Sequence, residues 1–448
     1  MQFAQYFEHL SNGIEKRSLQ IAIVGLGYVG LPTAIAFHKA GFNVVGIDSS
    51  ISVIKSLRLG KSPITDEVGL AVPSGDGWEV TTDYGNSIPN CDLAIICVPT
   101  PVDDNLQPDI RSVKSAIDSI IGSIEGERKL AIILESTVQP GTTRKCISDS
   151  VENFHTPSEQ VLMAYCPERV SPGEGGYGVQ DVGRVLGSED PDLAKILSEL
   201  YRTITSGDVT TVSSIEVAEA SKLVENAQRD IDIAFANELA VLMPKLGLDV
   251  EEVLSAASTK WNFHRHKPGI GVGGHCIPID PHYYIEIARN LGVKTAMSPA
   301  ARERNSSMPA ISAMEVIRLC EGIPPKRILV LGYSYKPNIS DSRETPVLPF
   351  INELFKMGVK EILVWDPFID SSKIPDSVKQ IFDPYEHKGV DCVVIATAHE
   401  EVKELDWSKL RKTVQTPRIF DGRRCIKPSF FQNSDWIFHA VGWPLGGI

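Results

Sequence analysis

The chain has 448 residues, of which 42% are hydrophobic and 23% charged, and its formal net charge is −13. At about 150 residues per domain, this length allows roughly three domains, and the composition excludes disordered, collagen-like and coiled-coil chains. The acidic balance argues against a protein that coats nucleic acid or an anionic membrane, so an anionic ligand has to be bound locally.

Targeting signals and cysteine spacing indicate where such a chain works. No apolar run approaches the ~18 residues of a membrane span. The start, MQFAQYFEHLSNGIEKR, contains acidic residues and no continuous apolar core, so we expect no signal peptide and a cytoplasmic protein. The eight cysteines show no CxxC pair and no disulfide-scaffold spacing, which fits a reducing compartment and predicts mostly buried thiols.

The first regular elements begin at Leu19. The stretch LQIAIVGLGYVGLPTAIAFHKAGFNVVGIDSS predicts a strand, a glycine-rich turn, a helix ending near Gly41 and a strand ending at Asp48, which is one βαβ unit. Strands that alternate with helix-length stretches indicate a parallel, doubly wound sheet. The further strands expected here are 93–98, 130–134 and 161–165, with a helix over 109–121.

The middle of the chain is helical, and the α/β pattern then returns. Residues 213–246 carry apolar side chains at helical spacing, which predicts a long helix with Pro244 at its end; helices also follow over 249–257 and 299–319. After Pro324 the strands RILVLG, EILVWDP, VDCVVIATA and RIFDG surround a helix over 345–357. We predict an α/β protein with two Rossmann-like, doubly wound parallel-sheet domains joined by a long central helix and a small helical domain. The expected boundaries are 1–209, 210–320 and 321–448.

The turn GLGYVG predicts a dinucleotide site. Gly25, Gly27 and Gly30 form a GxGxxG pattern between a strand and a helix, where the backbone allows a tight turn, a close approach by pyrophosphate and helix–strand packing. Asp48 follows Gly30 by eighteen residues, at the strand end where a carboxylate accepts the ribose hydroxyls. A ribose 2′-phosphate would be repelled there, so NAD is expected rather than NADP. The alternative is a glycine-rich turn that binds no ligand.

A glycine-rich lead-in to Cys276 predicts a reactive thiol. Glycines precede this cysteine in GIGVGGHC, and Pro281 then opens a helical pattern. A thiol among backbone amides near a helix N-terminus should ionise more easily than a buried one. The alternative for Cys276 is a small buried apolar residue. Asp280 has three alternatives: it caps the helix N-terminus, it takes part in the chemistry, or it does both.

Four histidines near Cys276 raise the possibility of a metal site. Their spacing matches neither HExxH nor a paired CxxC pattern, so no metal is predicted. These histidines are His264, His266, His275 and His282.

On the predicted long helix, Lys222 and Asn226 lie four residues apart and therefore share one face. They could form a partly buried pair directed at the cysteine loop. The alternative is a solvated face on which Lys222 forms ordinary ion pairs with Glu219 and Glu225.

Seven motifs in order resemble the UDP-sugar 6-dehydrogenases, and the match covers nearly the whole chain after the first twenty residues. The motifs are GLGYVG, CVPTP (97–101), ESTVQPGT (135–142), YCPERVSPG (165–173), EASKLVEN (219–226), GVGGHCIPIDP (271–281) and GYSYKPNISDSRETP (332–346). The resemblance implies an NAD domain, a nucleotide-sugar domain and a central helix that forms a homodimer. It also implies oxidation of the sugar C6 alcohol to a carboxylate with two NAD+, in surface polysaccharide or glycan biosynthesis.

The resemblance also implies a role for each matching residue. Cys276 would be the nucleophile, Lys222 and Asn226 would stabilise an oxyanion, and Asp280, Thr137 and Glu168 would handle protons and water. The expected NAD contacts are Gly25, Gly27, Tyr28, Val29, Gly30, Asp48, Pro99, Thr100, Thr137 and Arg343. The expected sugar-nucleotide contacts are Glu168, Arg169, Val170, Lys222, Asn226, His264, Arg265, Gly273, Lys336 and Arg423. The alternative for Lys336, Arg343 and Arg423 is a surface cation.

Two departures from the family pattern bear on substrate and cofactor. Many UDP-glucose enzymes read PEFLREG where this chain reads PERVSPG, with Pro172 replacing a second glutamate. This segment, together with ENAQRD and KWNF, resembles the branch that acts on UDP-N-acetylhexosamines of the GlcNAc or ManNAc type. Val53 stands where the family often has a cation for the adenosine end, so we expect either a lower cofactor affinity or another cation in its place. Three other readings stay open: UDP-glucose as substrate, a two-electron β-hydroxyacid-type dehydrogenase, and a non-catalytic binding protein.

Overall fold

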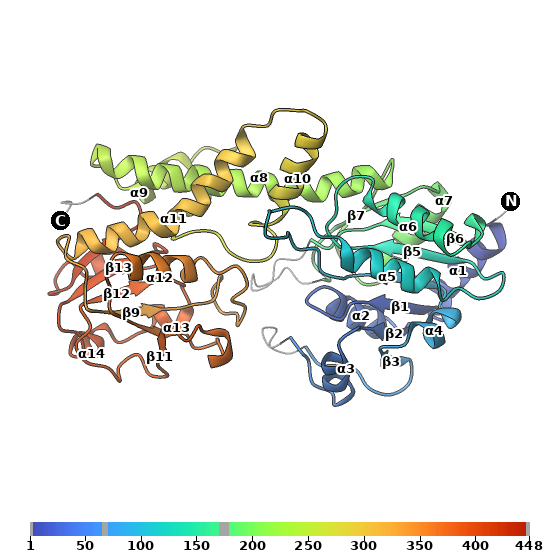
Figure 1. Ribbon diagram of the computed structural model, residues 1–448, viewed down its shortest axis with the longest axis horizontal. Helices are drawn as coiled ribbons and strands as arrows, with labels where there is room; N and C mark the ends of the chain where they lie inside the picture. Colours follow the sequence, from blue (N-terminus) through green and yellow to red (C-terminus); the bar gives the residue numbers. More distant parts are fainter. Residues whose placement is uncertain (1–2, 65–69, 170–178, 445–448) are drawn as a thin grey trace. The chain divides into compact units, whose positions relative to one another are not determined.

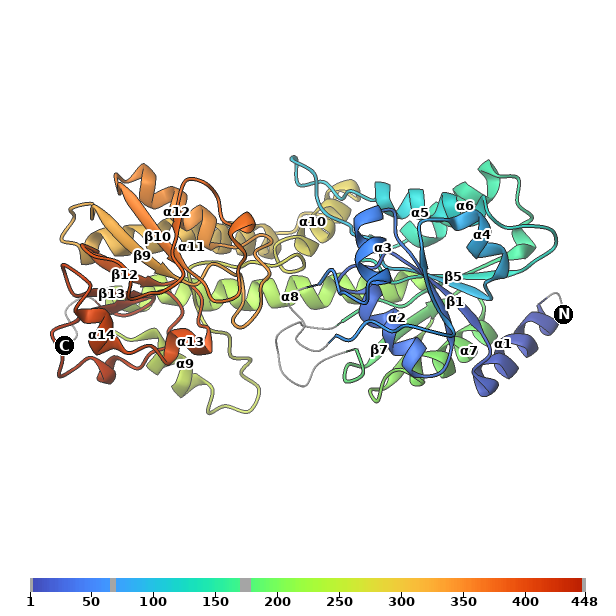
Figure 2. The same cartoon turned by 90° about the horizontal axis from the view of Figure 1, so that it is seen from below.

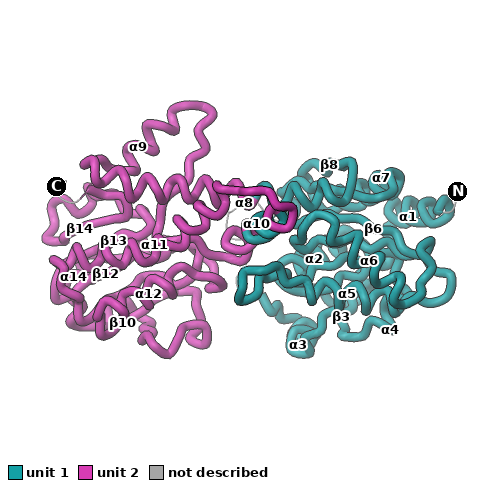
Figure 3. The backbone as a smooth tube through the Cα atoms, turned by 45° about the horizontal axis from the view of Figure 1, so that its top comes forward, with its two compact units in different colours: residues 1–225, 282–287 teal, residues 226–281, 288–448 magenta. Residues whose placement is uncertain are grey.

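The computed structural model describes residues 3–64, 70–169 and 179–444, and its chain divides into two compact units (Figures 1 and 3). The first unit comprises Met1–Glu225 and His282–Ile287, and the second comprises Asn226–Pro281 and Ala288–Ile448. Val170 and Pro172, both used in the sequence argument, lie outside the described residues.

The first unit is built on an eight-stranded sheet with strand order β3-β2-β1-β4-β5-β6-β7-β8. Neighbouring strands are parallel, as predicted, except that β6 and β7 pair antiparallel. This antiparallel pair is a local departure from the predicted parallel sheet, because a doubly wound sheet can carry strands of the opposite direction toward its edge. The strands are β1 (Gln20–Val24), β2 (Asn43–Ile47), β3 (Trp78–Thr81), β4 (Leu93–Ile96), β5 (Leu130–Leu134), β6 (Val161–Tyr165), β7 (Arg184–Ser188) and β8 (Val209–Val212).

Helices cover both faces of this sheet because alternate strand residues point to opposite sides. Ile21 and Ile23 of β1 join the core under α2 and α7, whereas Ala22 and Val24 join the core under α5 and α6 (Figure 2). The helices of this unit are α1 (Ala4–Lys16), α2 (Gly30–Lys39), α3 (Ile51–Arg58), α4 (Tyr84–Ser87), α5 (Arg111–Ile121), α6 (Thr142–Asn153) and α7 (Pro191–Arg202), with 3₁₀ turns η1 (Ile88–Asn90) and η2 (Ser158–Gln160).

Helix α1 accounts for most of the N-terminal residues for which the sequence analysis predicted no structure. Leu10 and Ile14 bury their side chains in the core of the first unit. The Tyr6 hydroxyl donates to the carbonyl of Asp92 at 2.5 Å and accepts from the amide of Ala131 at 2.8 Å. This single side chain therefore joins the amino ends of β4 and β5.

The second unit contains a six-stranded parallel sheet with order β11-β10-β9-β12-β13-β14. Helices α11 and α12 pack on one face, and α13 and α14 pack on the other. The strands are β9 (Arg327–Leu331), β10 (Glu361–Trp365), β11 (Lys379–Gln380), β12 (Cys392–Ile395), β13 (Arg418–Asp421) and β14 (Ile437–Ala440). The helices are α9 (Val250–Ala257), α11 (Met297–Leu319), α12 (Val347–Lys356), α13 (Glu400–Lys403) and α14 (Trp407–Arg411), with 3₁₀ turns η4 (Ser371–Lys373) and η5 (Pro428–Phe430).

Two helices contribute residues to both units. The predicted long helix is α8 (Ile215–Leu242), which passes into the 3₁₀ turn η3 (Met243–Leu246) at Pro244, where no backbone N–H is available to continue it. Helix α10 (Asp280–Asn290) gives residues 282–287 to the first unit. Among the helices described, none is long and apolar enough to cross a membrane.

Candidate functional site

The turn after β1 has a backbone that other residues could not adopt. Gly25 has φ +89°, and a Cβ there would lie 2.8 Å from the carbonyl oxygen of Cys97. A Cβ on Gly30 would lie 1.8 Å from the carbonyl oxygen of Gly25. Only a glycine at position 30 therefore lets the start of α2 pack this closely against the turn after β1. Gly27 is exposed, with no atom within 4 Å of a Cβ position. The middle of the turn is therefore open to a ligand.

Asp48 is fixed beside this turn at the carboxyl end of β2. One carboxylate oxygen accepts from the amide of Leu26 and the other accepts from the amide of Ser50, both at 2.8 Å. Each oxygen has a second lone pair, and the residue is half-buried, so hydroxyl groups of a ribose can still donate to it. The residues present fit a dinucleotide bound across the N-terminus of α2.

The loops after β4 and β5 carry the other expected NAD residues of the first unit. Thr100 and Thr137 are half-buried and Pro99 is exposed, while Tyr28 and Val29 are half-buried in the glycine turn. The Tyr283 hydroxyl donates to the carbonyls of Thr100 and Pro101 at 3.0 and 3.2 Å. Gln139 donates to the carbonyl of Tyr283 at 3.1 Å. These bonds hold residues 282–287 of α10 against both loops.

Glu168 is a buried carboxylate with both oxygens engaged. Oε1 accepts from the amide of Arg169 at 2.6 Å, and Oε2 lies 2.8 Å from a guanidinium nitrogen of Arg184. Arg184 also pairs with Glu135 at 3.2 Å. Burial raises the pKa of Glu135, although the positive charge of Arg184 acts to lower it. The sequence analysis missed Arg184, because its place opposite Glu168 depends on the β6–β7 register, which follows from neither motif nor spacing.

Lys222 is buried on α8, and its acidic neighbours are occupied elsewhere. Glu219 is fully buried and accepts from the amides of Gly141 and Thr143 at the start of α6, at 2.5 and 2.9 Å. Glu225 forms an ion pair with Arg169 at 2.8 Å. The alternative that Lys222 forms a surface ion pair with Glu219 is therefore wrong, because Glu219 is buried and accepts hydrogen bonds from the N-terminus of α6.

In the second unit, Cys276 lies in the turn that leads into α10. It is half-buried, and its carbonyl accepts from the amides of Ile279 and Asp280 at 3.0 and 2.8 Å. Asp280 is buried, and Oδ2 accepts from the Asn226 side chain at 2.5 Å. Asn226 of α8 and Asp280 of α10 therefore form a direct pair, and Asp280 follows Cys276 by four residues in the sequence.

The glycines before Cys276 let two loops of the second unit pack closely. A Cβ on Gly273 would lie 2.7 Å from the carbonyl oxygen of Glu344, and one on Gly271 would lie 2.8 Å from Pro346. The amide of Gly274, which has φ +88°, donates to the carbonyl of Arg343 at 3.2 Å. The loop that contains Cys276 thus rests on the loop that follows β9.

The expected cations of the second unit have different surroundings. Arg423 donates to the carbonyls of Ala396 and Gly271, at 2.6 and 3.4 Å, and burial lowers its pKa to about 10. Arg343 is exposed and pairs with Asp341 at 2.6 Å, and Arg265 pairs with Glu251 of α9. His264 is exposed and Lys336 is half-buried.

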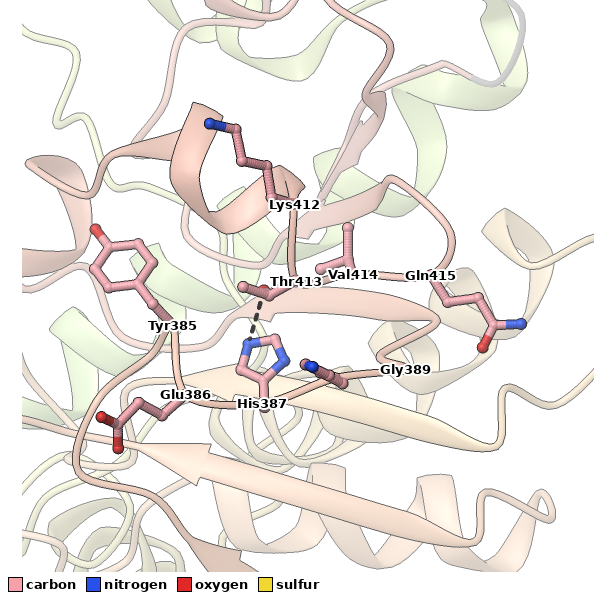
Figure 4. A pocket seen from close by; sticks show the side chains of 9 residues that line it. Tyr385, Glu386, His387, Gly389, Lys412, Thr413, Val414 and Gln415 are labelled. Carbon is pink, nitrogen blue, oxygen red and sulfur yellow. Dashed lines mark hydrogen bonds between the residues drawn. The ribbon is translucent and has the colours of Figure 1, made fainter.

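A separate open pocket of the second unit contains none of these residues (Figure 4). It lies at the amino ends of β12 and β13, where Nε2 of His387 is 3.4 Å from Oγ1 of Thr413. Its lining is Tyr385, Glu386, His387, Lys388, Gly389, Lys412, Thr413, Val414 and Gln415. Within the described ranges, no three His, Cys, Asp or Glu side chains are grouped so that they could hold a metal ion.

Two doubly wound units, one with a dinucleotide turn and one with a glycine-bounded cysteine, define a Rossmann-type dehydrogenase architecture. The chain belongs to the UDP-glucose/GDP-mannose dehydrogenase family. Residues 19–205 match its NAD binding domain, 216–307 its central domain and 329–428 its UDP binding domain. The predicted fold class and the resemblance are thereby confirmed.

Individual relatives are similar over nearly their full length. The chain is 33% identical over 404 residues to UDP-N-acetyl-D-glucosamine 6-dehydrogenase of Pseudomonas aeruginosa, covering 88% of this chain and 94% of that protein. It is 35% identical over 433 residues to UDP-N-acetyl-D-mannosamine dehydrogenase of Pyrococcus horikoshii, covering 95% and 99%. The solved structure of UDP-D-ManNAc dehydrogenase from Pyrococcus horikoshii has a TM-score of 0.84 and 32% identity, covering 96% of this chain and 100% of that one. These relatives support a nucleotide-sugar dehydrogenase.

Proposed function

We propose that this protein is an NAD-dependent UDP-N-acetylhexosamine 6-dehydrogenase that oxidises the C6 alcohol of UDP-GlcNAc or UDP-ManNAc to the carboxylate. The observation that carries the proposal is the hydrogen bond from Asn226 to Asp280, because Asp280 follows by four residues a half-buried Cys276 that ends a run of glycines. A two-electron dehydrogenase needs no such thiol. The product, a UDP-linked uronate, would serve surface polysaccharide or glycan biosynthesis.

The first unit would hold the cofactor. The amides at the start of α2, around Gly25, Gly27 and Gly30, would bind the pyrophosphate, and Asp48 would accept the ribose hydroxyls and disfavour a 2′-phosphate. When bound, NAD+ supplies the hydride acceptor for each of the two oxidations. The remaining proposed contacts are Tyr28, Val29, Pro99, Thr100, Thr137 and Arg343.

Cys276 would divide the four-electron oxidation into steps of two electrons. Its thiolate adds to the carbonyl carbon of the C6 aldehyde and forms a thiohemiacetal, which loses hydride to give a thioester. Water then adds to the thioester, and the C–S bond breaks to release the carboxylate and the Cys276 thiol. In sum, one alcohol, two NAD+ and one water give one carboxylate, two NADH and three protons.

The other proposed catalytic residues would stabilise charge and move protons. Lys222 and Asn226 would donate to the oxygen that becomes negative at C6, where a cation and an amide N–H suit the developing charge. Asp280, held by Asn226, would accept the proton of the alcohol and later of water. Glu168 and Thr137 would orient the water that hydrolyses the thioester.

The second unit would bind the nucleotide sugar, and the N-acetyl group is the finer part of the proposal. Lys336 and Arg423 would contact the UDP moiety, since guanidinium and ammonium groups suit phosphate recognition. Further proposed contacts are Arg169, Val170, His264, Arg265 and Gly273. The segments PERVSPG, ENAQRD and KWNF, together with two relatives named for N-acetylated sugars, favour an N-acetylhexosamine over glucose.

We also propose the division 1–209, 210–320 and 321–448, with the central part forming a homodimer. Along α8, four large apolar side chains remain about half-exposed, and at about 100° per residue they fall within about 20° of one another. They are Val217 (45%), Val224 (54%), Phe235 (54%) and Leu242 (48%). A second copy of the chain would cover this stripe.

A stoichiometric assay with the purified protein tests the proposed function. UDP-GlcNAc, UDP-ManNAc, UDP-GalNAc and UDP-glucose are each supplied with NAD+, and NADH formed per sugar consumed is counted. We expect two NADH per sugar with an N-acetylated substrate. One NADH per sugar would reject the thioester route, and preference for UDP-glucose would reject the N-acetyl assignment. No turnover with any sugar would favour a binding protein.

A further inference from the structure

A buried ion pair joins the two long helices α8 and α11 within the second unit. Arg302 of α11 binds Asp230 of α8 through two nitrogens, with Nε 2.8 Å from Oδ2 and a terminal nitrogen 2.7 Å from Oδ1. The Asp230 side chain is fully buried, and the Arg302 side chain is 10% exposed. Such a planar, two-point contact fixes the guanidinium in direction as well as in position.

The same guanidinium reaches the loop of Cys276 on its carboxyl-terminal side. The remaining terminal nitrogen of Arg302 donates to the carbonyl of Pro278 at 3.3 Å. Pro278 lies two residues beyond Cys276, between the thiol and the start of α10. The ion pair therefore holds the backbone directly after the cysteine.

A chain of side-chain amides extends from Asp230 to the amino-terminal side of the loop. Asn305 donates to Oδ1 of Asp230 at 2.7 Å, and Asn237 donates to Oδ1 of Asn305 at 2.8 Å. The side-chain oxygen of Asn237 then accepts from the amide of Gly269 at 3.0 Å. One continuous buried network thus runs from Gly269 to Pro278 and holds both ends of the segment that contains Cys276.

This loop depends on anchors outside itself. Four of the eight residues from 269 to 276 are glycine, and glycine has the largest backbone freedom to lose on ordering. The network is satisfied at each step, and buried polar networks of this kind specify one arrangement of the backbone around them. Burial raises the pKa of Asp230, and Arg302, together with Asn305, works against this rise.

We propose that Arg302 and Asp230 are positioning residues for Cys276. Arg302 acts through Pro278, and Asp230 acts through Arg302 and through the two asparagines. The inference rests on the proposed function, because the loop is of catalytic interest only if Cys276 is the nucleophile. The positioning itself is a property of the folded chain that needs neither substrate nor cofactor.

The test is the rate at which iodoacetamide alkylates each cysteine of the full-length native protein, measured by peptide mass spectrometry. The pH is about 9.5, above the ordinary thiol pKa, and each rate is compared with that of the same cysteine in the wild-type protein. Arg302→Lys keeps the charge beside Asp230 but cannot bridge to Pro278, and Asp230→Asn removes the ion pair. The matched control is Asp249→Asn, which removes the partner of Arg424 in the same unit and keeps the N-cap of α9.

We expect both variants to raise the Cys276 rate at least fivefold. The rate of Cys425, the other half-exposed cysteine, and the rates of the six buried cysteines should stay within twofold of wild type, as should every rate in Asp249→Asn. An unchanged or lower Cys276 rate would overturn the proposal. So would a joint rise of all eight rates, because it would show a merely structural role. A selective rise in a protein without nucleotide-sugar turnover would reject the proposed function and leave the positioning intact.

Discussion

Two turns at equivalent places in the two units differ in what they can bind. Gly25 after β1 and Gly332 after β9 both have φ +89°, and their amides donate to the last residues of the adjacent strands at 2.8 and 2.7 Å. The next amide in each turn donates to an aspartate, Asp48 in the first unit and Asp366 in the second, at 2.8 and 2.6 Å. Up to this residue the two turns are alike.

The turns then diverge. Ser334 and Pro337 occupy the positions that correspond to Gly27 and Gly30, and α12 begins only at Val347, whereas α2 begins at Gly30 itself. Asp366 is buried and lies 3.1 Å from the ring of a fully buried histidine, His399. The helix N-terminus and the accessible acid that a dinucleotide requires are therefore features of the first turn only. The central strand order is therefore similar in the two units, and the two turns differ in the residues after the first glycine and in the exposure of the aspartate.

The largest expected effect concerns the nucleophile that we assign to the second unit. Cys276→Ser should lower acid formation by about 10³-fold or more, because a serine hydroxyl is a far weaker nucleophile than a thiolate near neutral pH. The measurement is uronate formed per enzyme with saturating NAD+ and UDP-sugar.

Cys425→Ser is the matched control for that variant, because Cys425 is also half-exposed and lies in the same unit. It should keep acid formation within about twofold of wild type. Equal losses in both variants would contradict a specific role for Cys276.

Changing Asp366 or Asp48 to asparagine should affect different properties of the protein. Asp366→Asn should lower the free energy of unfolding by about 2–3 kcal/mol, because it weakens charge-assisted hydrogen bonds in a buried site. Asp48→Asn should leave stability nearly unchanged and raise the KM for NAD+ about tenfold, about 1.4 kcal/mol. Urea unfolding and steady-state kinetics measure the two effects. An effect of Asp366→Asn on the KM for NAD+ comparable to that of Asp48→Asn would remove the distinction between the turns.

Acid should affect the two sheets in opposite directions. Burial alone would raise the pKa of Asp366, but the hydrogen bond and charge of His399 and the amides of Tyr333 and Ser334 hold that pKa below its ordinary value. Its contribution to stability is therefore complete above about pH 4 and is lost as pH falls through the lowered pKa. Burial raises the pKa of Glu135 in the first unit, so its protonation favours the fold and stability falls as pH rises through that pKa.

Hydrogen exchange of β9 and β1 between pH 7 and pH 3 measures this difference. Protection of β9 should decline as pH falls, by about 1.4 kcal/mol for each unit of pKa difference, whereas protection of β1 should not, and Asp366→Asn should abolish the decline. The same decline in β1 and β9, unaffected by Asp366→Asn, would contradict it.

The smallest effect should come from removing the Tyr6 hydroxyl, whose contacts lie within the first unit. Tyr6→Phe removes a hydroxyl that both donates to Asp92 and accepts from Ala131, so it should cost about 1–2 kcal/mol of stability. Thermal unfolding measures the loss, and activity at low temperature should stay near wild type. A neutral Tyr6→Phe together with a destabilising Phe7→Leu would assign the anchoring of α1 to apolar packing instead.

Local signals account for the parts of the fold that the sequence predicted. The βαβ unit from Leu19 to Asp48 and the end of α8 at Pro244 follow from glycine, proline and periodicity within a few turns of chain. Helix α1 has no comparable signal, because the partners of Tyr6 lie 86 and 125 residues away.

The candidate site divides in the same way. GxGxxG and the glycines before Cys276 are continuous motifs, so their chemistry can be inferred directly from the chain. Arg184 beside Glu168 and Arg302 beside Asp230 depend on strand register and on the packing of α8 against α11. Neither pair has a spacing that identifies it, so only the folded structure brings these charges together.

The contact made by Tyr6 also sets an order in time. Synthesis proceeds at about 5–20 residues per second, so Ala131 follows Tyr6 out of the synthetic machinery by about 6–25 s. Helix α1 is thus made before β4 and β5, and the Tyr6 hydroxyl gains both partners only after β5 has been made. During this interval its apolar face, with Leu10 and Ile14, has no sheet to cover it. A nascent chain halted before residue 131 would present this face to chaperones, and one halted after the first sheet is complete would not.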